Sequence, residues 1–173
     1  MSIPEKKVIL LVEDEALIEV VEKEILNHLG YEVITTNSGE MAVETVLNDN
    51  NKIDLILMDI NLGQGIDGPE TAERILKEKD IPIVFIATHS EKEYVEKLKR
   101  ISCYGCVFKP SGEFVLNSSI EIALEQFQAR KNLQKKMERL HQMMKIYQET
   151  ENETFLNENE IGSECFEAIN YNH

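Results

Sequence analysis

The stretch VILLVEDE, at residues 8–15, is an apolar run that stops abruptly at three acidic residues. Three later runs share this design, each being apolar and followed at once by a polar residue: LILM before Asp59, IVFIA before Thr88, and CVF before Lys109. Short runs rich in Val, Ile and Leu are typical of strands buried on both faces of a parallel sheet. Because the carboxyl ends of parallel strands share one edge, we expect these polar side chains to meet there.

Segments of helical periodicity separate the apolar runs, and this alternation predicts an α/β domain with a doubly wound, five-stranded parallel sheet. We expect strands at residues 7–12, 31–35, 54–59, 82–88 and 105–108. We expect helices at residues 15–29, 38–49, 69–79 and 91–100, with a last one from about residue 113. Ser38 is a candidate N-cap, Pro69 suits a first helical turn, and Gly30 is expected to end the first helix in the left-handed conformation.

The helix expected at residues 15–29 has an apolar set at spacings of three and four: Leu17, Val20, Val21, Ile25 and Leu29. Such a pattern indicates one buried face. We therefore expect this set to pack on the sheet. The charged residues between them are expected to face solvent: Glu19, Glu22 and Lys23.

Composition indicates a globular protein that does not cross a membrane. The chain has 173 residues, of which 42% are hydrophobic and 29% are charged. No apolar stretch approaches the roughly 20 residues that a spanning helix needs. The net charge of −14 disfavours nucleic acid and anionic lipid as partners. Three cysteines, an odd number, and a first apolar run that ends in acids fit a cytoplasmic protein better than a secreted one.

Two motifs suggest chemistry that their context does not support. Residues 63–68 match the G-x-G-x-x-G pattern of dinucleotide-binding loops, but they follow the third expected strand, and no acid ends the next one. Cys103 and Cys106 form a C-x-x-C that leads into a strand instead of opening a helix. No second pair completes a zinc site. We interpret both cysteines as buried thiols.

The last helix extends beyond the end of a compact domain, so we divide the chain into residues 1–128, 129–148 and 149–173. The middle segment has an apolar stripe at spacings of four and three: Leu133, Met137, Leu140, Met144 and Tyr147. The stripe favours two interpretations, a short coiled coil that joins two copies and a helix that folds back on its own domain. The last segment is rich in Glu, lacks Lys and Arg, and is expected to be a disordered tail. Neither segment has room for a helix-turn-helix output domain.

The polar residues expected at the sheet edge comprise three carboxylates, a hydroxyl and an ammonium: Glu13, Asp14, Asp59, Thr88 and Lys109. Carboxylates this close repel one another unless a cation lies between them. Oxygen ligands are those that Mg²⁺ prefers. The pattern therefore predicts a magnesium site at which a carboxylate can react with a phosphoryl group.

A resemblance to the response regulator receiver domains of two-component signalling rests on five motifs: VEDE (12–15), LILMDI (55–60), DG (67–68), FIATHS (85–90) and VFKP (107–110). It covers about residues 5–128. It implies a flavodoxin-like, CheY-like sheet with strand order 2-1-3-4-5, here with an extended C-terminal helix. It also implies a cis peptide before Pro110.

The same resemblance implies the roles of the site residues. Asp59 would be the phosphoacceptor, and Thr88 and Lys109 would contact the phosphoryl oxygens. Glu13, Asp14, Asp59 and the backbone carbonyl of Asn61 would hold Mg²⁺. A sensor histidine kinase or a phosphotransfer protein would donate the phosphoryl group. Such a protein catalyses only its own phosphorylation and dephosphorylation, and it signals through contact with another protein.

Two positions depart from the usual pattern of this family. Receivers usually carry an aromatic residue three positions before the lysine, where this chain has Cys106, and a small residue after the threonine, where it has His89. One alternative is a receiver-fold interaction or dimerisation module without a phosphate cycle. Another is a Mg²⁺-dependent phosphohydrolase with an aspartyl intermediate, although Asp59-Ile60-Asn61 lacks the second acid of the D-x-D motif that such enzymes carry.

Overall fold

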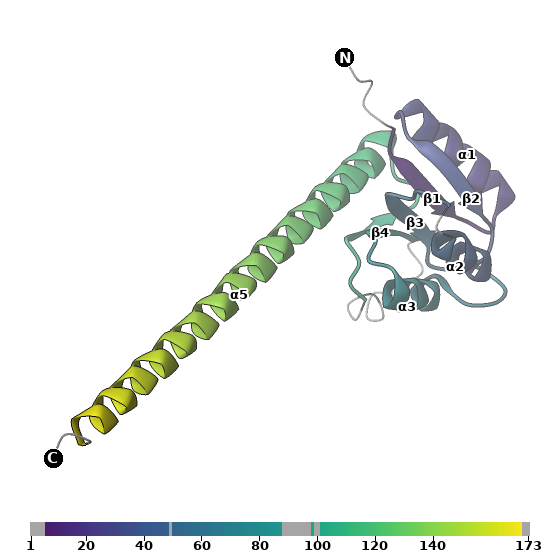
Figure 1. Ribbon diagram of the computed structural model, residues 1–173. Helices are drawn as coiled ribbons and strands as arrows, with labels where there is room; N and C mark the ends of the chain where they lie inside the picture. Colours follow the sequence, from purple (N-terminus) through teal and green to yellow (C-terminus); the bar gives the residue numbers. More distant parts are fainter. Residues whose placement is uncertain (1–5, 49, 88–97, 99–100, 171–173) are drawn as a thin grey trace. The chain divides into compact units, whose positions relative to one another are not determined.

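The computed structural model describes residues 6–48, 50–87, 98 and 101–170, with residues 151–170 described by their backbone alone (Figure 1). By its internal contacts the chain divides into two units, Met1–Gln128 and Ala129–His173. In the part of the chain that the structure covers, no helix combines the length and the apolarity needed to cross a membrane.

The first unit is built on a five-stranded, all-parallel sheet with the order β2-β1-β3-β4-β5. Its strands are β1 (Val8–Val12), β2 (Glu32–Thr36), β3 (Leu55–Asp59), β4 (Ile83–Ala87) and β5 (Gly105–Phe108). The predicted flavodoxin-like fold and strand order are thus confirmed, and each strand lies within one residue of its predicted bounds. The register is fixed by burial, since successive residues of β1 face opposite cores.

Helices cover both faces of this sheet: α1 (Ala16–His28), α2 (Gly39–Leu47), α3 (Gly68–Glu78) and the first turns of α5 (Glu113–Asn170) (Figure 1). One core includes Leu10 and Val12 of β1 with residues of α2 and α3. The other includes Ile9 and Leu11 with Leu26 of α1 and the buried residues of α5. The helix predicted at residues 91–100 lies outside the described residues, apart from Leu98.

Local sequence explains where these helices begin and end. The Ser38 side chain accepts a hydrogen bond from the Met41 N–H at 3.3 Å, as an N-cap should. Asp67 caps α3 in the same way, and Pro69 lies in its first turn. Gly30 follows α1 with a φ of +91°, a conformation that favours glycine. The Lys109–Pro110 peptide is cis, as expected.

The buried face of α1 was predicted wrongly. Leu17 is 85% exposed, and Val20 and Val21 are also exposed, whereas Glu22 and Leu26 are buried. The face that contacts the sheet is therefore rotated relative to the apolar set chosen from the sequence. The physical reason is that Glu22 faces a lysine ammonium across the fold, and this attraction offsets part of the cost of burying a carboxylate.

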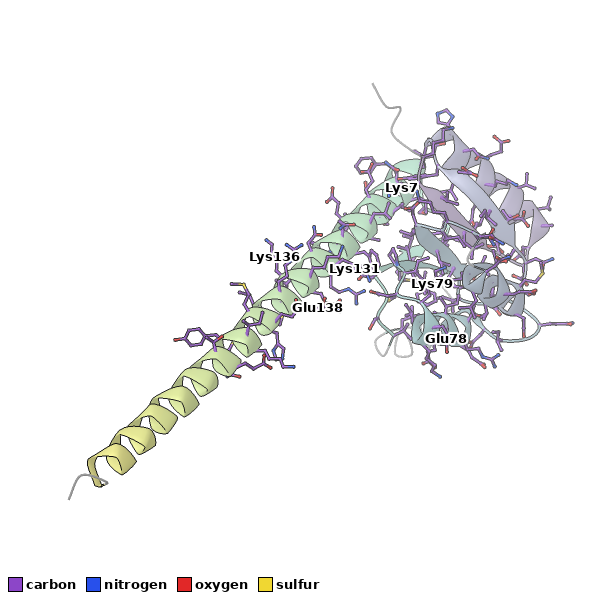
Figure 2. The ribbon with its side chains drawn as sticks, viewed as in Figure 1. Lys7, Glu78, Lys79, Lys131, Lys136 and Glu138 are labelled. Atoms are coloured by element: carbon purple, nitrogen blue, oxygen red, sulfur yellow. The ribbon has the colours of Figure 1, made fainter. Side chains whose placement is uncertain are left out.

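In the second unit the backbone of α5 is helical to Asn170, beyond the end at residue 148 that we expected. Residues 149–161 contain no Gly or Pro, and Glu and Leu support helix propagation. Nearer the start of the second unit, charged side chains project from α5, among them Lys131, Lys136 and Glu138 (Figure 2). The residues of the apolar stripe are each 60–64% exposed: Leu133, Met137, Leu140, Met144 and Tyr147.

Candidate functional site

Three of the predicted site residues lie together at the carboxyl edge of the sheet. Backbone hydrogen bonds extend the strand ladders past the strand ends, from Glu13 N–H to the Thr36 carbonyl and from Lys109 N–H to the Ala87 carbonyl. Asp59 is the last residue of the central strand β3. The three side chains therefore start from adjacent points of one edge, as the sequence predicted.

The ammonium of Lys109 is the centre of this cluster. Its Nζ lies 2.6 Å from Asp59 Oδ2 and also donates a hydrogen bond to Glu13 Oε2. Glu22 Oε1, from α1, lies 3.6 Å from the same nitrogen. The side chain of Lys109 is only 14% exposed, and its carboxylate partners are no more exposed. One ammonium thus faces three carboxylates that water reaches poorly.

The second oxygens of these three carboxylates differ in their hydrogen bonding. Asp59 Oδ1 accepts a hydrogen bond from the Asn61 N–H at 3.0 Å, and Glu13 Oε1 accepts one from the Glu15 N–H at 3.1 Å. These bonds orient both acids from the loops that follow their strands. Glu22 Oε2, by contrast, is buried without a hydrogen-bond partner.

Burial and mutual repulsion perturb the protonation of the cluster. Burial raises the pKa of Glu13 to about 7, with the neighbouring Asp59 adding to the effect and the Lys109 hydrogen bond opposing it. Burial also raises the pKa of Glu22. Burial alone would lower the pKa of the Lys109 ammonium, but hydrogen bonds to Asp59 and Glu13 outweigh it and raise that pKa above its usual value. Lys109 is therefore a permanent positive charge in this site.

The side chain of Asp14 lies beside the loop between β3 and α3. It is exposed, and a Cβ placed on Gly63 would come within 2.6 Å of Asp14 Oδ2. Gly63 also has a φ of +63°, so both backbone and space favour glycine there. The side chain of Asn61 belongs to the same loop and accepts a hydrogen bond from the Gly63 N–H at 3.4 Å.

The donor set fits Mg²⁺ by its chemistry, since it offers carboxylate and carbonyl oxygens. Among the described residues, no three acidic, histidine or cysteine side chains already converge in a metal-binding arrangement. In the structure the Lys109 ammonium is hydrogen-bonded to one oxygen of Glu13 and to one oxygen of Asp59. A metal at these acids would have to displace part of that bonding.

The sequence also singles out the threonine after β4 and the cysteines in and before β5. Thr88 and its neighbour His89 lie outside the described residues. Cys106 lies in β5, half-buried, and packs against the core shared with α2 and α3. Cys103 packs against the same core, and among the described residues neither cysteine forms a disulfide.

Gly68, at the start of α3, has a role that its motif did not reveal. A Cβ on this residue would lie 2.1 Å from the backbone carbonyl oxygen of Asp59. The amino end of α3 therefore packs directly against the backbone at the end of β3. Sequence reasoning recorded the Asp67-Gly68 pair but not this contact, because it joins two segments that only the fold brings together.

A family profile described as "Response regulator receiver domain" matches residues 9–121, which is more than half of the chain. The chain belongs to this family. The crystal structure of the N-terminal domain of a three-domain response regulator/sensory box/GGDEF protein from Carboxydothermus hydrogenoformans is 42% identical, with a TM-score of 0.67. It aligns with 72% of this chain, and 98% of that chain is covered. A signal receiver domain of a modulated diguanylate cyclase from Desulfovibrio desulfuricans G20 is 31% identical, with a TM-score of 0.67, over 73% of this chain and 99% of that chain.

Among curated relatives, the transcriptional regulatory protein PdtaR of Mycobacterium tuberculosis is 32% identical over 120 residues. The match covers 69% of this chain and 57% of PdtaR. The two-component response regulator ARR12 of Arabidopsis thaliana is 31% identical over 53% of this chain, but only 15% of ARR12 is covered. The chain thus spans a little over half, or less, of the length of these relatives. Receiver domains are generally signalling modules rather than enzymes, they act with histidine kinases or phosphotransfer proteins, and as a family they bind Mg²⁺ at the phosphorylation site.

Proposed function

We propose that this receiver accepts a phosphoryl group from a histidine kinase or phosphotransfer protein onto Asp59 and then signals through contact with another protein. The observation that carries the proposal is the position of Asp59, with one oxygen bonded to the Lys109 ammonium and the other to the Asn61 N–H. This arrangement aims a carboxylate at the open edge of the sheet and places a positive charge beside it. Both features are what attack on an anionic phosphorus requires.

In the proposed reaction an Asp59 carboxylate oxygen forms a bond to phosphorus as the bond from phosphorus to the donor histidine nitrogen breaks. Bound Mg²⁺ would neutralise charge on both reactants. Glu13, Asp14, Asp59 and the backbone carbonyl of Asn61 are the proposed ligands. Lys109 would move from Asp59 to a phosphoryl oxygen, and Thr88 would contact another. Beyond this transfer and the later hydrolysis of its own phosphate, we propose no turnover of other substrates.

An apolar surface beside the site supports docking of a donor protein. A pocket of about 400 Å³ lies between α1 and the segment after β5, and Lys109 is one of its lining residues. Its apolar walls include Leu17, Val21 and Pro110. Leu17 and Val21 are exposed, although each would gain from burial. A helical donor protein that covered this surface would bring its phosphohistidine to the edge of the sheet where β3 ends at Asp59.

Self-association through residues 129–148 is a second proposal, with an independent basis. The stripe of Leu133, Met137, Leu140, Met144 and Tyr147 is exposed along α5 and has the alternating spacing of a coiled-coil seam. Two copies joined along it would bury these side chains. The stripe covers few heptads, so we expect a weak dimer rather than an obligate one.

We also propose that the protein is cytoplasmic and that neither nucleic acid nor an anionic membrane is its partner. Cys103 and Cys106 form no disulfide within the described part of the chain, which is in keeping with a reducing, cytoplasmic setting. The net charge of −14 opposes a direct role for nucleic acid or anionic membrane as partner.

The experiment is incubation of the full chain with Mg²⁺ and a small acyl phosphate, followed by intact mass measurement. We expect an increase of about 80 Da, the mass of one phosphoryl group, in the wild type and none in Asp59→Asn. No adduct on the wild type would favour the alternative of a receiver-fold interaction module without a phosphate cycle. An adduct that persists in the variant would contradict the choice of Asp59.

A further inference from the structure

Glu22 is a buried carboxylate for which the phosphorylation chemistry gives no reason. It lies in the middle of α1, is 9% exposed, and has one oxygen, Oε2, without a hydrogen-bond partner. Its other oxygen lies 3.6 Å from Lys109 Nζ, too far for a good hydrogen bond. The contact is therefore electrostatic rather than a formed bond.

The surroundings of Glu22 would suit an apolar side chain better. Glu22 is one of the residues that line the pocket between α1 and the segment after β5. The other lining residues are mostly apolar: Leu17, Ile18, Val21, Ile25, Ile86 and Leu116. Burying a carboxylate among such neighbours costs free energy, and a well-packed hydrophobic replacement is often at least as stable. Stability of the metal-free fold thus does not account for Glu22.

A metal ion bound by Glu13 and Asp59 would compete with the Lys109 ammonium for their oxygens, and Glu22 can then interact with that ammonium. The ammonium bridges Glu13 and Asp59, and a divalent ion between those acids would compete with it. Lys109 is largely shielded from water, so an ammonium that left both acids would need another anion nearby. Among the described residues, Glu22 is a further carboxylate near this ammonium, 3.6 Å from it, and it comes from α1.

We propose that Glu22 is a positioning residue that receives the Lys109 ammonium when Mg²⁺ binds at Glu13 and Asp59. Glu22 keeps the charge of Lys109 compensated inside the site and so favours the metal-bound form. It also holds the ammonium beside the place where the phosphoryl group arrives. This inference rests on the proposed function, since it concerns the same metal and the same lysine.

The test is a calorimetric titration of Mg²⁺ into the full chain, with circular dichroism to verify folding. We expect Glu22→Gln to weaken Mg²⁺ binding by about tenfold or more, as expected for loss of a charged partner of the Lys109 ammonium in the metal-bound form. Glu22→Leu, which suits the apolar pocket, should give a similar loss and serves if the glutamine variant fails to fold. Glu24→Gln is the matched control, because Glu24 is exposed on the same helix and carries the same charge.

A second comparison separates positioning from simple attraction between Glu22 and the metal. In a Lys109→Met background, Glu22→Gln should change Mg²⁺ affinity by about twofold or less, because the ammonium with which Glu22 interacts is absent. An equal or larger effect in that background, or no effect in the wild-type background, overturns the inference while leaving the proposed function intact. A wild type that takes up no Mg²⁺ contradicts the proposed function itself, and the inference with it.

Discussion

Replacement of Lys109 by methionine removes the ammonium that contacts three buried carboxylates, and its effect on stability follows from the geometry. Lys109 donates to Glu13 and Asp59 directly and lies close to Glu22. Methionine keeps most of the side-chain volume, so the main change is electrostatic. Removing one partner of a buried ion pair typically costs several kcal/mol, because the other partner is left uncompensated. We expect Lys109→Met to lower the free energy of unfolding by about 3 kcal/mol in the absence of divalent ions.

The size of this loss should depend on pH in a definite direction. The pKa of Glu13 is already raised to about 7, and loss of the lysine raises it further, because the hydrogen bond from Lys109 lowers it. The folded variant therefore holds protons that the unfolded chain releases, so its stability falls as pH rises. The deficit relative to wild type should be larger at about pH 8 than at about pH 6, where protonation of Glu13 removes one unpaired charge.

The assay is urea denaturation followed by circular dichroism, with EDTA and then with saturating Mg²⁺. Because Mg²⁺ can replace the missing positive charge, it should reduce the deficit of Lys109→Met to about 1 kcal/mol or less. Lys77→Met is the control, since Lys77 is an exposed residue of α3. A Lys109→Met protein as stable as wild type in EDTA would refute the electrostatic reasoning, and so would a deficit that Mg²⁺ leaves unchanged.

Three further predictions concern other parts of the chain. Gly68→Ala should lower the free energy of unfolding by about 2–3 kcal/mol, because its Cβ would collide with the Asp59 carbonyl, whereas Gly112→Ala meets nothing nearby; equal denaturation midpoints would disprove this. Leu140→Lys should shift the mass seen by light scattering towards the monomer, and an unchanged mass would remove the proposed dimer seam. The stability contributed by protonated Glu13 is fully present below its usual pKa of 4.5 and is lost as pH rises through about 7. Glu13→Gln should therefore flatten the decline of metal-free stability over that range, and parallel pH profiles for wild type and variant would contradict it.

Much of the fold and the heart of the site could be predicted because they depend on local signals. Apolar runs bounded by polar residues identify buried strands, and parallel strands bring Glu13, Asp59 and Lys109 to one edge. Cap residues such as Ser38 act through a hydrogen bond within a few positions. Such features require no knowledge of what lies opposite in space.

The face of α1 could not be predicted in this way because it depends on a distant partner. Periodicity treats every glutamate as a solvent-facing residue, so it placed Glu22 outside and Leu17 inside. The structure reverses both, since Glu22 lies near an ammonium supplied by the end of β5. The tight approach of Gly68 to the Asp59 carbonyl escaped prediction for the same reason.

The central claim is that Asp59 forms an acyl phosphate in a reaction that needs Mg²⁺. The most direct measurement is peptide mapping after borohydride reduction, which converts an aspartyl phosphate into homoserine and so marks the residue that carried the phosphoryl group. After reaction with acyl phosphate and Mg²⁺, the account predicts homoserine at position 59 and none when EDTA replaces Mg²⁺. Homoserine at another acid, or equal labelling of Asp59 with and without the metal, would contradict it.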